Sequence, residues 1–343
     1  MIPIHNLYYL LCYAWHRLPD PAEAQAMEAQ EFHRPLALLT HLLLVATRRQ
    51  LRRGLAVGYS EQEAELTELR GRVQLAPTLA RDLLRRGRAV CTYEELSADT
   101  PLNQLLAGTL AQLSRTRALP AATRQQVRQL LGRFPAAVRP TPPTDEVLRQ
   151  LRRQRWPGAQ AFLLHLCDLL HQCALPVPDE AGRHRFRDFR RDEVLMARLF
   201  EQFVRNFYRL EQRRYRVRSE TIAWQAVAEQ PEHLDLLPAM ITDTSLEAPD
   251  RKIILDTKYY AAALRTRHNR QRLIAPHLYQ LYAYLQNQPA ALGQQLEGIL
   301  LYPAATQEVD LSYNLGGHPV RVVTLDLAQP WPSIAAALLA LIS

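Results

Sequence analysis

Lysine is almost absent from this chain. Only two of its 42 basic side chains are lysine, Lys252 and Lys258, and the other 40 are arginine. A guanidinium is planar and always charged, whereas an ammonium is a compact charge with an adjustable pKa, so the two do not replace each other freely. Because both lysines fall within seven consecutive residues, we expect at least one of them to have a role that arginine cannot fill.

Other absences exclude several protein classes. The four cysteines have no CxxC spacing, which is typical of reduced thiols rather than of a disulfide framework. No apolar run reaches the ~18 residues of a membrane helix, and no basic region precedes the apolar N-terminal segment as in a secretion signal. The sequence therefore predicts a cytoplasmic protein with no membrane partner. It also lacks a GxxxxGK[ST] motif, so we expect no nucleotide in a P-loop.

Size and charge bound what the chain can be. With 343 residues, 48% of them apolar, it is long enough for two packed domains at roughly 150 residues each. A net charge of +8 favours an anionic partner, nucleic acid first, unless the soluble surface simply happens to be basic. We place the domain boundary in the loop at 174–182, which gives domains 1–178 and 179–343.

The first domain is predicted to be mostly helical. Apolar residues recur at helical spacing over 32–53, 77–86, 101–115, 121–131, 145–153 and 159–173. Short strands at 55–59 and 71–75 are expected to flank an acidic loop at 61–68.

The second domain alternates between helical and strand patterns. We expect a helix at 192–212, strands at 215–218, 234–242 and 252–258, a helix at 273–286, strands at 298–302 and 320–325, and a last helix from Trp331. This order predicts an α/β (α+β) fold in which helices cover a mixed sheet.

A predicted hairpin in the second domain carries the chemistry. The apolar run 253–255 delivers Asp256 and Lys258 two positions apart, and therefore on the same face of a strand. Pro249-Asp250 is a turn dipeptide, and a two-residue turn there pairs positions whose numbers add to 499. Asp243 then lies directly across from Asp256, with Lys258 diagonally beside them.

Two opposed carboxylates next to an ammonium indicate a metal site. The carboxylates repel unless a cation lies between them, and such hard oxygen ligands suit Mg²⁺. The side chain of Lys258 can then orient or deprotonate a water, which is the arrangement for metal-assisted phosphodiester hydrolysis. An exposed ion pair between Asp256 and Lys258 is the alternative. We expect Lys252, beside the turn, to be incidental, and Asp235, eight residues before Asp243, to be structural.

The acid, hairpin and Asp-x-Lys pattern resembles the PD-(D/E)xK nuclease superfamily, and the flanking sequence resembles its McrC branch. McrC proteins are the nuclease subunits of modification-dependent McrBC restriction systems. Eight blocks carry the resemblance in order: 2–15, 69–73, 93–106, 184–193, 236–243, 254–260, 277–285 and 329–334.

The resemblance implies a fold and a set of site residues. Residues 179–343 are expected to form a restriction-endonuclease-like mixed sheet flanked by helices, with Asp243 and Asp256 as metal ligands and Lys258 as the catalytic lysine. The family pattern adds Glu201 as a third carboxylate of the metal and catalytic site, with a charge on the helix surface as the alternative. It also adds Gln280 to the catalytic set, for which plain helix packing is the alternative.

The resemblance also implies partners and an activity. McrC-like chains act with an McrB-like AAA+ GTPase hexamer, so GTP is expected on the partner and not on this chain. Residues 1–178 are then the docking domain, and Arg70, Arg72 and the acidic loop are candidates for the inserted element. The implied function is that of a Mg²⁺-dependent endonuclease subunit, type II/IV-like, of a GTP-dependent complex that restricts double-stranded DNA containing 5-methylcytosine and that stimulates the GTPase.

Two arginine clusters are candidate DNA contacts. One follows the catalytic strand, with Arg265, Arg267, Arg270 and Arg272, and the other contains Arg187 and Arg190. Either cluster is equally consistent with a solvated face. Two rival functions stay open: a non-catalytic adaptor that binds DNA and activates a GTPase, and a stand-alone PD-(D/E)xK repair nuclease.

Overall fold

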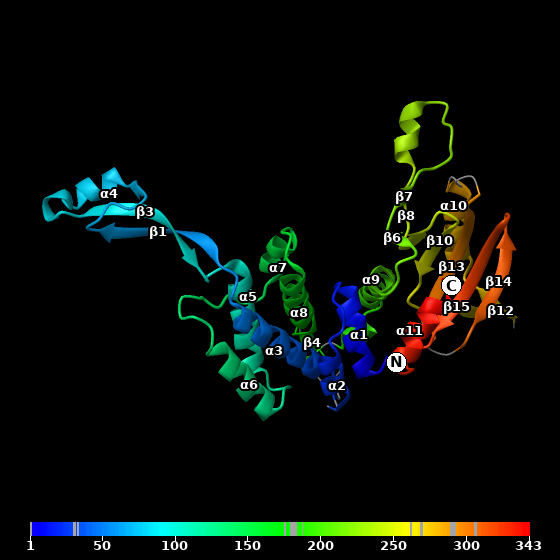
Figure 1. Ribbon diagram of the computed structural model, residues 1–343, viewed down its shortest axis with the longest axis horizontal. Coiled ribbons are helices and arrows are strands. Elements are labelled where there is room, and N and C mark those ends of the chain that lie inside the picture. The colour runs from blue at the N-terminus through cyan, green and yellow to red at the C-terminus, as the bar shows by residue number, and fades with distance from the viewer. Residues whose placement is uncertain are drawn as a thin grey trace. The chain divides into compact units, whose positions relative to one another are not determined.

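The chain forms two compact units (Figure 1). The computed structural model describes residues 2–29, 32, 34–174, 176–178, 184–186, 188–260, 263–267, 270–288, 293–304 and 307–343. The first unit combines Met1–Leu38 with Asp188–Ser343, and the second is Leu39–Arg187. Within the described ranges, none of the helices is both long enough and apolar enough to cross a bilayer.

The first unit contains helices and a mixed sheet, as the sequence predicts. Its helical segments are α1 (Ile4–Ala14), α2 (Pro21–Ala29), η2 (Phe189–Arg191), α9 (Glu193–Glu211), η3 (Pro231–Leu236), α10 (Ala275–Asn287) and α11 (Trp331–Ala340). Its strands are β6 (Arg216–Arg218), β7 (Thr221–Ile222), β8 (Met240–Ile241), β9 (Thr244–Glu247), β10 (Arg251–Thr257), β11 (Leu264–Arg267), β12 (Arg270–Leu273), β13 (Gln295–Pro303), β14 (Asp310–Leu315) and β15 (His318–Leu325).

Strand β10 lies inside the six-stranded sheet, whose order is β14-β15-β13-β10-β9-β6. It runs parallel to β13 and antiparallel to β9. The predicted hairpin register is confirmed, because the four observed pairs run from Lys252 with Glu247 to Leu255 with Thr244. The side chains from Lys252 to Thr257 are all buried, so this strand ends inside the protein and not at its surface.

The predicted domain boundary is wrong for the N-terminal residues. The break at 187/188 lies close to the expected one, but residues 1–38 belong to the unit that contains the sheet. Helix α1 is buried from Asn6 to Ala14, so it needs partners on several sides. Tyr9 stacks on Trp331 at 4.5 Å between ring centroids, and Asn206 Nδ2 donates to the carbonyl of Ala14 at 3.0 Å.

The predicted strand at 234–242 is also wrong. Its first three residues belong to the 3-10 segment η3, and only Met240 and Ile241 form a strand. The stretch is mostly apolar, as in a buried strand, but Pro238 lies inside it and interrupts any ladder. Asp235 therefore lies on an exposed turn of η3, away from any strand.

The second unit is mostly helical, as predicted. The unit begins at Leu39, inside α3 (Pro35–Arg53). Its other helical segments are α4 (Leu75–Ala80), η1 (Leu84–Arg86), α5 (Pro101–Arg115), α6 (Ala121–Leu131), α7 (Asp145–Arg152) and α8 (Gly158–Ala174). Its strands are β1 (Gly58–Leu66), β2 (Arg72–Val73), β3 (Ala89–Ser97), β4 (Pro176–Pro178) and β5 (His184–Phe186).

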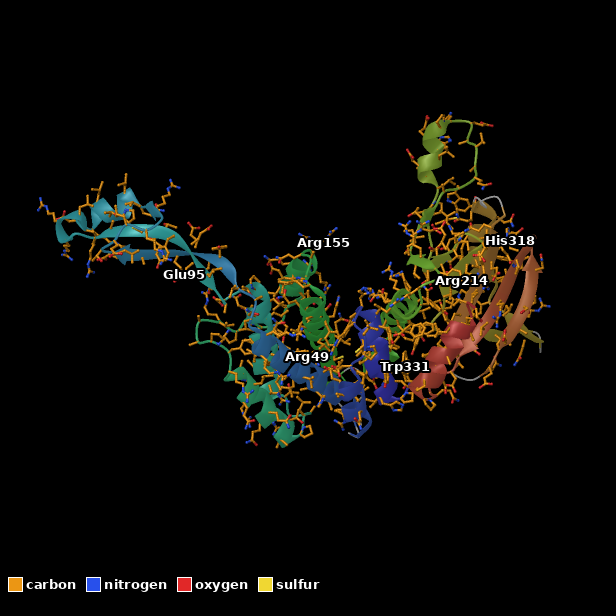
Figure 2. All side chains as sticks on the ribbon, in the orientation of Figure 1. Arg49, Glu95, Arg155, Arg214, His318 and Trp331 are labelled. Carbon is orange, nitrogen blue, oxygen red and sulfur yellow. The ribbon has the colours of Figure 1, made fainter. Side chains whose placement is uncertain are left out.

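The acidic segment at 61–68 is largely a strand and not the expected loop. Most of it lies in β1, which pairs along nine residues with β3 to form an antiparallel ribbon. With β2 and α4, this ribbon extends away from the helices of its own unit, and Glu95 is one of its exposed side chains (Figure 2). Strand β3 is not evident from the sequence because its exposure changes along its length. Residues 89–91 are buried and residues 94–96 are exposed, so the strand lacks the regular apolar alternation of a half-buried strand.

Gly298 on β13 lies where α10 packs against the sheet. A Cβ at this position falls 2.9 Å from Leu285 Cδ1 and 3.0 Å from Leu281 Cδ2, both on α10. We expect Gly298→Val to lower the urea midpoint by the equivalent of about 1–3 kcal/mol, because the helix must move off the sheet. The matched control is Gly158→Ala, which meets no atom within 4 Å and has a midpoint at or above that of the wild type. An unchanged midpoint for Gly298→Val contradicts this packing.

Candidate active site

Asp256 is a buried carboxylate at the end of β10. Its side chain is 0% exposed, and Oδ1 accepts no hydrogen bond from any residue that the structure describes. Oδ2 lies 2.8 Å from Lys258 Nζ. Burial, together with the charges of Asp243 and Glu201, raises the pKa of Asp256 to about 7 against the opposing effect of Lys258. Such a carboxylate is stabilised by a proton or by a cation.

Asp243 reaches the end of β10 through its side chain. Strand β9 begins one residue later, at Thr244, so the expected pairing of Asp243 with Asp256 lies just beyond the observed ladder. Instead, Asp243 Oδ2 accepts two hydrogen bonds from Thr257, from its N–H at 2.8 Å and from its hydroxyl at 2.7 Å. The two carboxylates are therefore close, as predicted, but strand pairing does not hold them there.

A directional hydrogen-bond chain holds Lys258. The Lys258 Nζ donates to Gln280 Oε1 at 2.7 Å, and Gln280 Nε2 donates to the Tyr284 hydroxyl at 2.7 Å. That hydroxyl donates to the carbonyl of Ile241 at 2.9 Å. Because the hydroxyl proton is committed to a carbonyl, Tyr284 accepts from the Gln280 amide and so turns the amide oxygen toward Lys258.

The chain of contacts places the predicted Gln280 at the site and adds Tyr284, which sequence analysis missed. Spacing was the available signal, since residues four apart on a helix lie on the same face. The alternative of an exposed ion pair does not hold, because Lys258 is only 15% exposed and Asp256 is fully buried.

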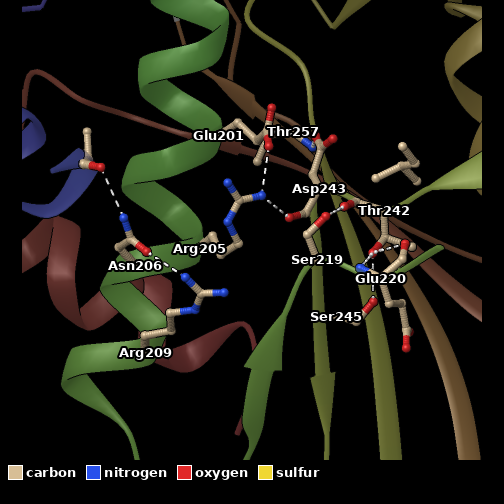
Figure 3. A network of polar contacts seen from close by, with 12 residues as sticks. Glu201, Arg205, Asn206, Arg209, Ser219, Glu220, Thr242, Asp243, Ser245 and Thr257 are labelled. Atoms are coloured by element: carbon tan, nitrogen blue, oxygen red, sulfur yellow. Dashed lines mark hydrogen bonds and ion pairs between the residues drawn. The ribbon is translucent and has the colours of Figure 1, made fainter. Parts of the chain in front are cut away.

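Glu201 faces the site from α9, as predicted, but it has a partner that the sequence did not suggest. Arg205 Nη1 donates to Glu201 Oε1 at 2.8 Å and to the main-chain carbonyl of Asp243 at 2.7 Å (Figure 3). Burial and the charge of Asp243 raise the pKa of Glu201, whereas Arg205 and Lys258 lower it. One guanidinium thus joins the helix carboxylate to the strand that carries Asp243.

The donor set fits a Mg²⁺ ion held by two carboxylates. Among the described residues, no three His, Cys, Asp or Glu side chains converge closely enough to hold a metal ion. Mg²⁺ does not require three, because it commonly keeps several waters and takes one or two protein carboxylates together with substrate phosphate. Asp243 and Asp256 meet that requirement, and the unpartnered Oδ1 of Asp256 is the atom most in need of a cation. Glu201 as a third ligand stays a prediction.

Lys252 is not incidental, contrary to expectation. Its side chain is 3% exposed, and Nζ lies 2.7 Å from Glu220 Oε1. Lys252, Arg218 and the Ser245 hydroxyl all lower the pKa of Glu220 against the effect of burial, which raises it. The buried pair ties β10 to the β6–β7 connection, so Lys252 has a structural role.

The candidate DNA contacts lie on different kinds of structure. The predicted basic loop after the catalytic strand is the hairpin β11–β12, in which Arg272 is exposed and pairs across the ladder with Arg265. The side chains of Arg265, Arg267 and Arg270, and the whole of Arg187, lie outside the described residues. Arg190 is held by Asp188, with Nη2 to Oδ2 at 2.6 Å, and is only 13% exposed, so it has little freedom to reach a phosphate.

Arg70 and Arg72 lie beside the middle of β3 in the ribbon of the second unit. The Arg70 guanidinium lies over the ring of Tyr93 at 4.3 Å, and Arg72 pairs with Thr92 in the ladder. Gly71 between them has φ +68°, and a Cβ there falls 2.3 Å from the Thr92 carbonyl. Only glycine fits this turn, which presents both arginines to solvent.

Comparison with known proteins gives consistent matches. Residues 5–303 match the family described as "McrBC 5-methylcytosine restriction system component". The chain is 29% identical over 341 residues to a protein of Escherichia coli strain K12 named "Type IV methyl-directed restriction enzyme EcoKMcrBC", covering 99% of this chain and 97% of that one. A structure of Thermococcus gammatolerans McrB AAA+ hexamers with bound McrC matches with a TM-score of 0.56 and 15% identity, over 99% of this chain and 76% of that one. This last likeness concerns the fold.

Because Asp256 is buried, we expect its ionisation to lower the stability of the folded chain without metal, and we expect bound metal to reverse this effect. Without divalent cations, ionisation of Asp256 costs stability as the pH rises from about 4, its unfolded value, to about 7, because the folded state binds the proton more tightly. At pH 8 in chelator we expect Asp256→Asn to be more stable than the wild type, by no more than about 4 kcal/mol. Millimolar Mg²⁺ is expected to stabilise the wild type and not the variant.

Differential scanning fluorimetry across pH 4–8, with chelator or Mg²⁺, measures this effect. The control is Asp250→Asn, an exposed carboxylate in the β9–β10 turn that is paired with Arg214. It should follow the wild type in both buffers. A variant at Asp256 that is less stable than the wild type in chelator at pH 8 contradicts the reasoning.

Proposed function

This chain belongs to the McrBC family of 5-methylcytosine restriction system components, and we propose that it is the subunit that cuts DNA. One observation carries the proposal: Asp243, Asp256 and Lys258 meet at the end of a buried strand, where Asp256 lacks a hydrogen-bond donor for Oδ1 among the described residues. The Asp-x-Lys order and the flanking α9 and α10 support a PD-(D/E)xK mechanism.

Different residues of this chain have different roles in the proposed chemistry. Asp243 and Asp256 would hold a Mg²⁺ ion, with Glu201 as the proposed third carboxylate. When bound, Mg²⁺ would supply a Lewis acid that polarises the phosphate and lowers the pKa of water. Burial of Asp256 excludes bulk water from this carboxylate and strengthens its interaction with charge.

Lys258 acts on the substrate with its remaining N–H group. An ammonium has three donors, and Asp256 Oδ2 and Gln280 Oε1 lie at two of them. The third is free to bind a phosphate oxygen or the attacking water, where a positive charge offsets the negative charge that develops during hydrolysis. A planar guanidinium in the same place has a different reach and donor geometry, which accounts for lysine in an arginine-rich chain.

DNA is proposed to lie across the hairpin β11–β12, which follows Lys258 directly in the chain. Arg265, Arg267, Arg270 and Arg272 belong to this hairpin, and contacts from Arg187 stay part of the proposal. Contacts to the phosphate backbone need no base specificity, so recognition of modified cytosine is assigned to the partner.

The partner is proposed to be an McrB-like AAA+ hexamer that binds and hydrolyses GTP. The ribbon of the second unit suits docking because apolar side chains are exposed along it, namely Tyr59, Leu69, Leu75, Leu79, Leu84 and Leu96. Arg70 and Arg72 lie beside the middle of β3, where β2 begins. In the Thermococcus gammatolerans structure McrC is bound to McrB hexamers, which supports the same kind of assembly here.

Replacing Lys258 tests the nuclease. With an McrB-like partner, GTP, Mg²⁺ and methylated plasmid, we expect Lys258→Ala to reduce the cleavage rate by about a hundredfold or more. Stimulation of the partner GTPase should stay within twofold of wild type, because the ribbon is unchanged. Lys258→Arg is expected to be nearly as inactive, whereas Arg214→Ala, which removes an exposed charge from the same unit, leaves cleavage unchanged.

The outcomes separate the rival functions. Full cleavage by Lys258→Ala contradicts the proposed mechanism. No cleavage by the wild-type complex, with GTPase stimulation intact, favours a non-catalytic adaptor. Cleavage by the wild-type chain without partner and GTP favours a stand-alone nuclease.

Replacing Arg70 and Arg72 on the ribbon tests docking. We expect the double variant Arg70→Ala, Arg72→Ala to weaken partner binding by about tenfold, since arginines in protein interfaces often contribute this much. The control is the double variant Arg128→Ala, Arg149→Ala, which removes exposed arginines from α6 and α7 of the same unit. Surface plasmon resonance and GTPase stimulation measure the effect, and equal binding by both double variants removes this role from Arg70 and Arg72.

A further inference from the structure

The backbone that carries Asp243 lies between two strands. Strand β8 ends at Ile241 and β9 begins at Thr244, which leaves Thr242 and Asp243 outside both. Within the described chain, no main-chain N–H donates to the carbonyls of Thr242 and Asp243. A segment without a ladder has more freedom in φ and ψ than a strand, so another set of contacts must fix it.

Side chains from three other elements donate hydrogen bonds to the consecutive main-chain carbonyls of residues 241–243. The Tyr284 hydroxyl donates to Ile241 O at 2.9 Å, and the Ser219 hydroxyl donates to Thr242 O at 2.6 Å. Arg205 Nη1 donates to Asp243 O at 2.7 Å (Figure 3).

These donors come from α10, from the β6–β7 connection and from α9, so elements far apart in the sequence hold consecutive residues. The side-chain end of Asp243 is fixed independently, by the two hydrogen bonds from Thr257. The carboxylate is thus held at both ends, by its own oxygen and by the main chain behind it.

We propose that Tyr284, Ser219 and Arg205 form a carbonyl clamp that positions Asp243 to bind a divalent cation. They are positioning residues, because they act on Asp243 and not on the substrate. The inference rests on the proposed function, since it assumes that Asp243 binds metal. Mg²⁺ demands near-ideal geometry, and residues that orient ligands typically contribute strongly to metal affinity, so a shift of the Asp243 backbone weakens binding.

The fold does not depend on the clamp alone. Thr242 is also held by Glu220, whose carbonyl accepts from the Thr242 N–H at 2.9 Å and whose N–H donates to the Thr242 hydroxyl at 3.1 Å. That hydroxyl also lies 3.0 Å from Ser245 Oγ. Loss of one clamp donor therefore leaves the segment folded but its carbonyl free to rotate, so metal affinity changes more than stability.

Neutral substitutions test the clamp most cleanly. Arg205 also neutralises Glu201, so its removal changes the charge at the site as well as the geometry. Tyr284→Phe and Ser219→Ala each remove one hydroxyl without changing the charge. Tyr284→Phe also removes the acceptor of the Gln280 amide, whereas Ser219→Ala removes a clamp donor that has no contact with Lys258 or Gln280 among the described residues. Thr324→Ala is the matched control, because the hydroxyl of Thr324 on β15 also forms a hydrogen bond with the main chain, at Val309. In the sheet, β13 and β10 lie between β15 and β9, the strand that follows Asp243.

The experiment is titration of the full-length chain with Mn²⁺, with free Mn²⁺ followed by electron paramagnetic resonance. We expect Tyr284→Phe to raise the dissociation constant about tenfold, and the double variant with Ser219→Ala to raise it further. Ser219→Ala alone should have a smaller effect, about threefold, because water can replace the exposed Ser219 hydroxyl. Ser219→Thr, which keeps the hydroxyl, and Thr324→Ala should bind like the wild type.

Each outcome has a distinct meaning. Wild-type affinity in the double variant overturns the clamp and leaves the proposed nuclease intact. Equal loss of affinity in Thr324→Ala also overturns it, because the effect is then general destabilisation. A wild-type chain that binds no Mn²⁺ overturns the metal site itself. Melting temperatures in chelator are recorded for every variant. The clamp predicts that Mn²⁺ affinity falls in variants whose melting temperature stays within about 3 °C of that of the wild type.

Discussion

The arrangement of the first unit depends on one buried carboxylate. Asp256 is carried to the end of β10 by a run of apolar residues, and there it has an ion pair on one oxygen and, among the described residues, no donor for the other. A buried charge is costly unless it is compensated, so the neighbours of Asp256 make sense only together with a cation. Lys258 compensates part of the charge, and Asp243 and Glu201 add more of the same sign.

Much of this site could be predicted because a two-residue turn fixes the register of a hairpin. Pro249-Asp250 sets the pairing of β9 with β10, and with it the approach of Asp243 to Asp256. The strand break before Thr244 could not be predicted, because it depends on side chains that arrive from three separate elements. Arg205 and Tyr284 each lie four residues after a predicted site residue, but helical spacing alone does not distinguish a partner from a bystander.

The fold shows the same division between local and distant information. Helices such as α6, and strands such as β10, follow from local apolar patterns. The place of α1 depends on Trp331 and Asn206, more than 190 residues away, and no local pattern encodes such a contact. Strand β3 is buried over 89–91 and exposed over 94–96, so it has no regular alternation and could not be predicted, although it pairs along nine residues.

Both lysines form ion pairs with carboxylates, Lys252 in a buried position and Lys258 in a largely shielded one, and this explains their retention in an arginine-rich chain. Lys252 pairs with Glu220 and fixes the connection that carries Ser219, while Lys258 pairs with Asp256 at the proposed catalytic site. A compact ammonium fits both places. Anomalous diffraction from crystals soaked in Mn²⁺ tests the metal site most directly. A peak about 2.1 Å from one oxygen each of Asp243 and Asp256 is the expected result, and a map without a peak between these carboxylates contradicts it.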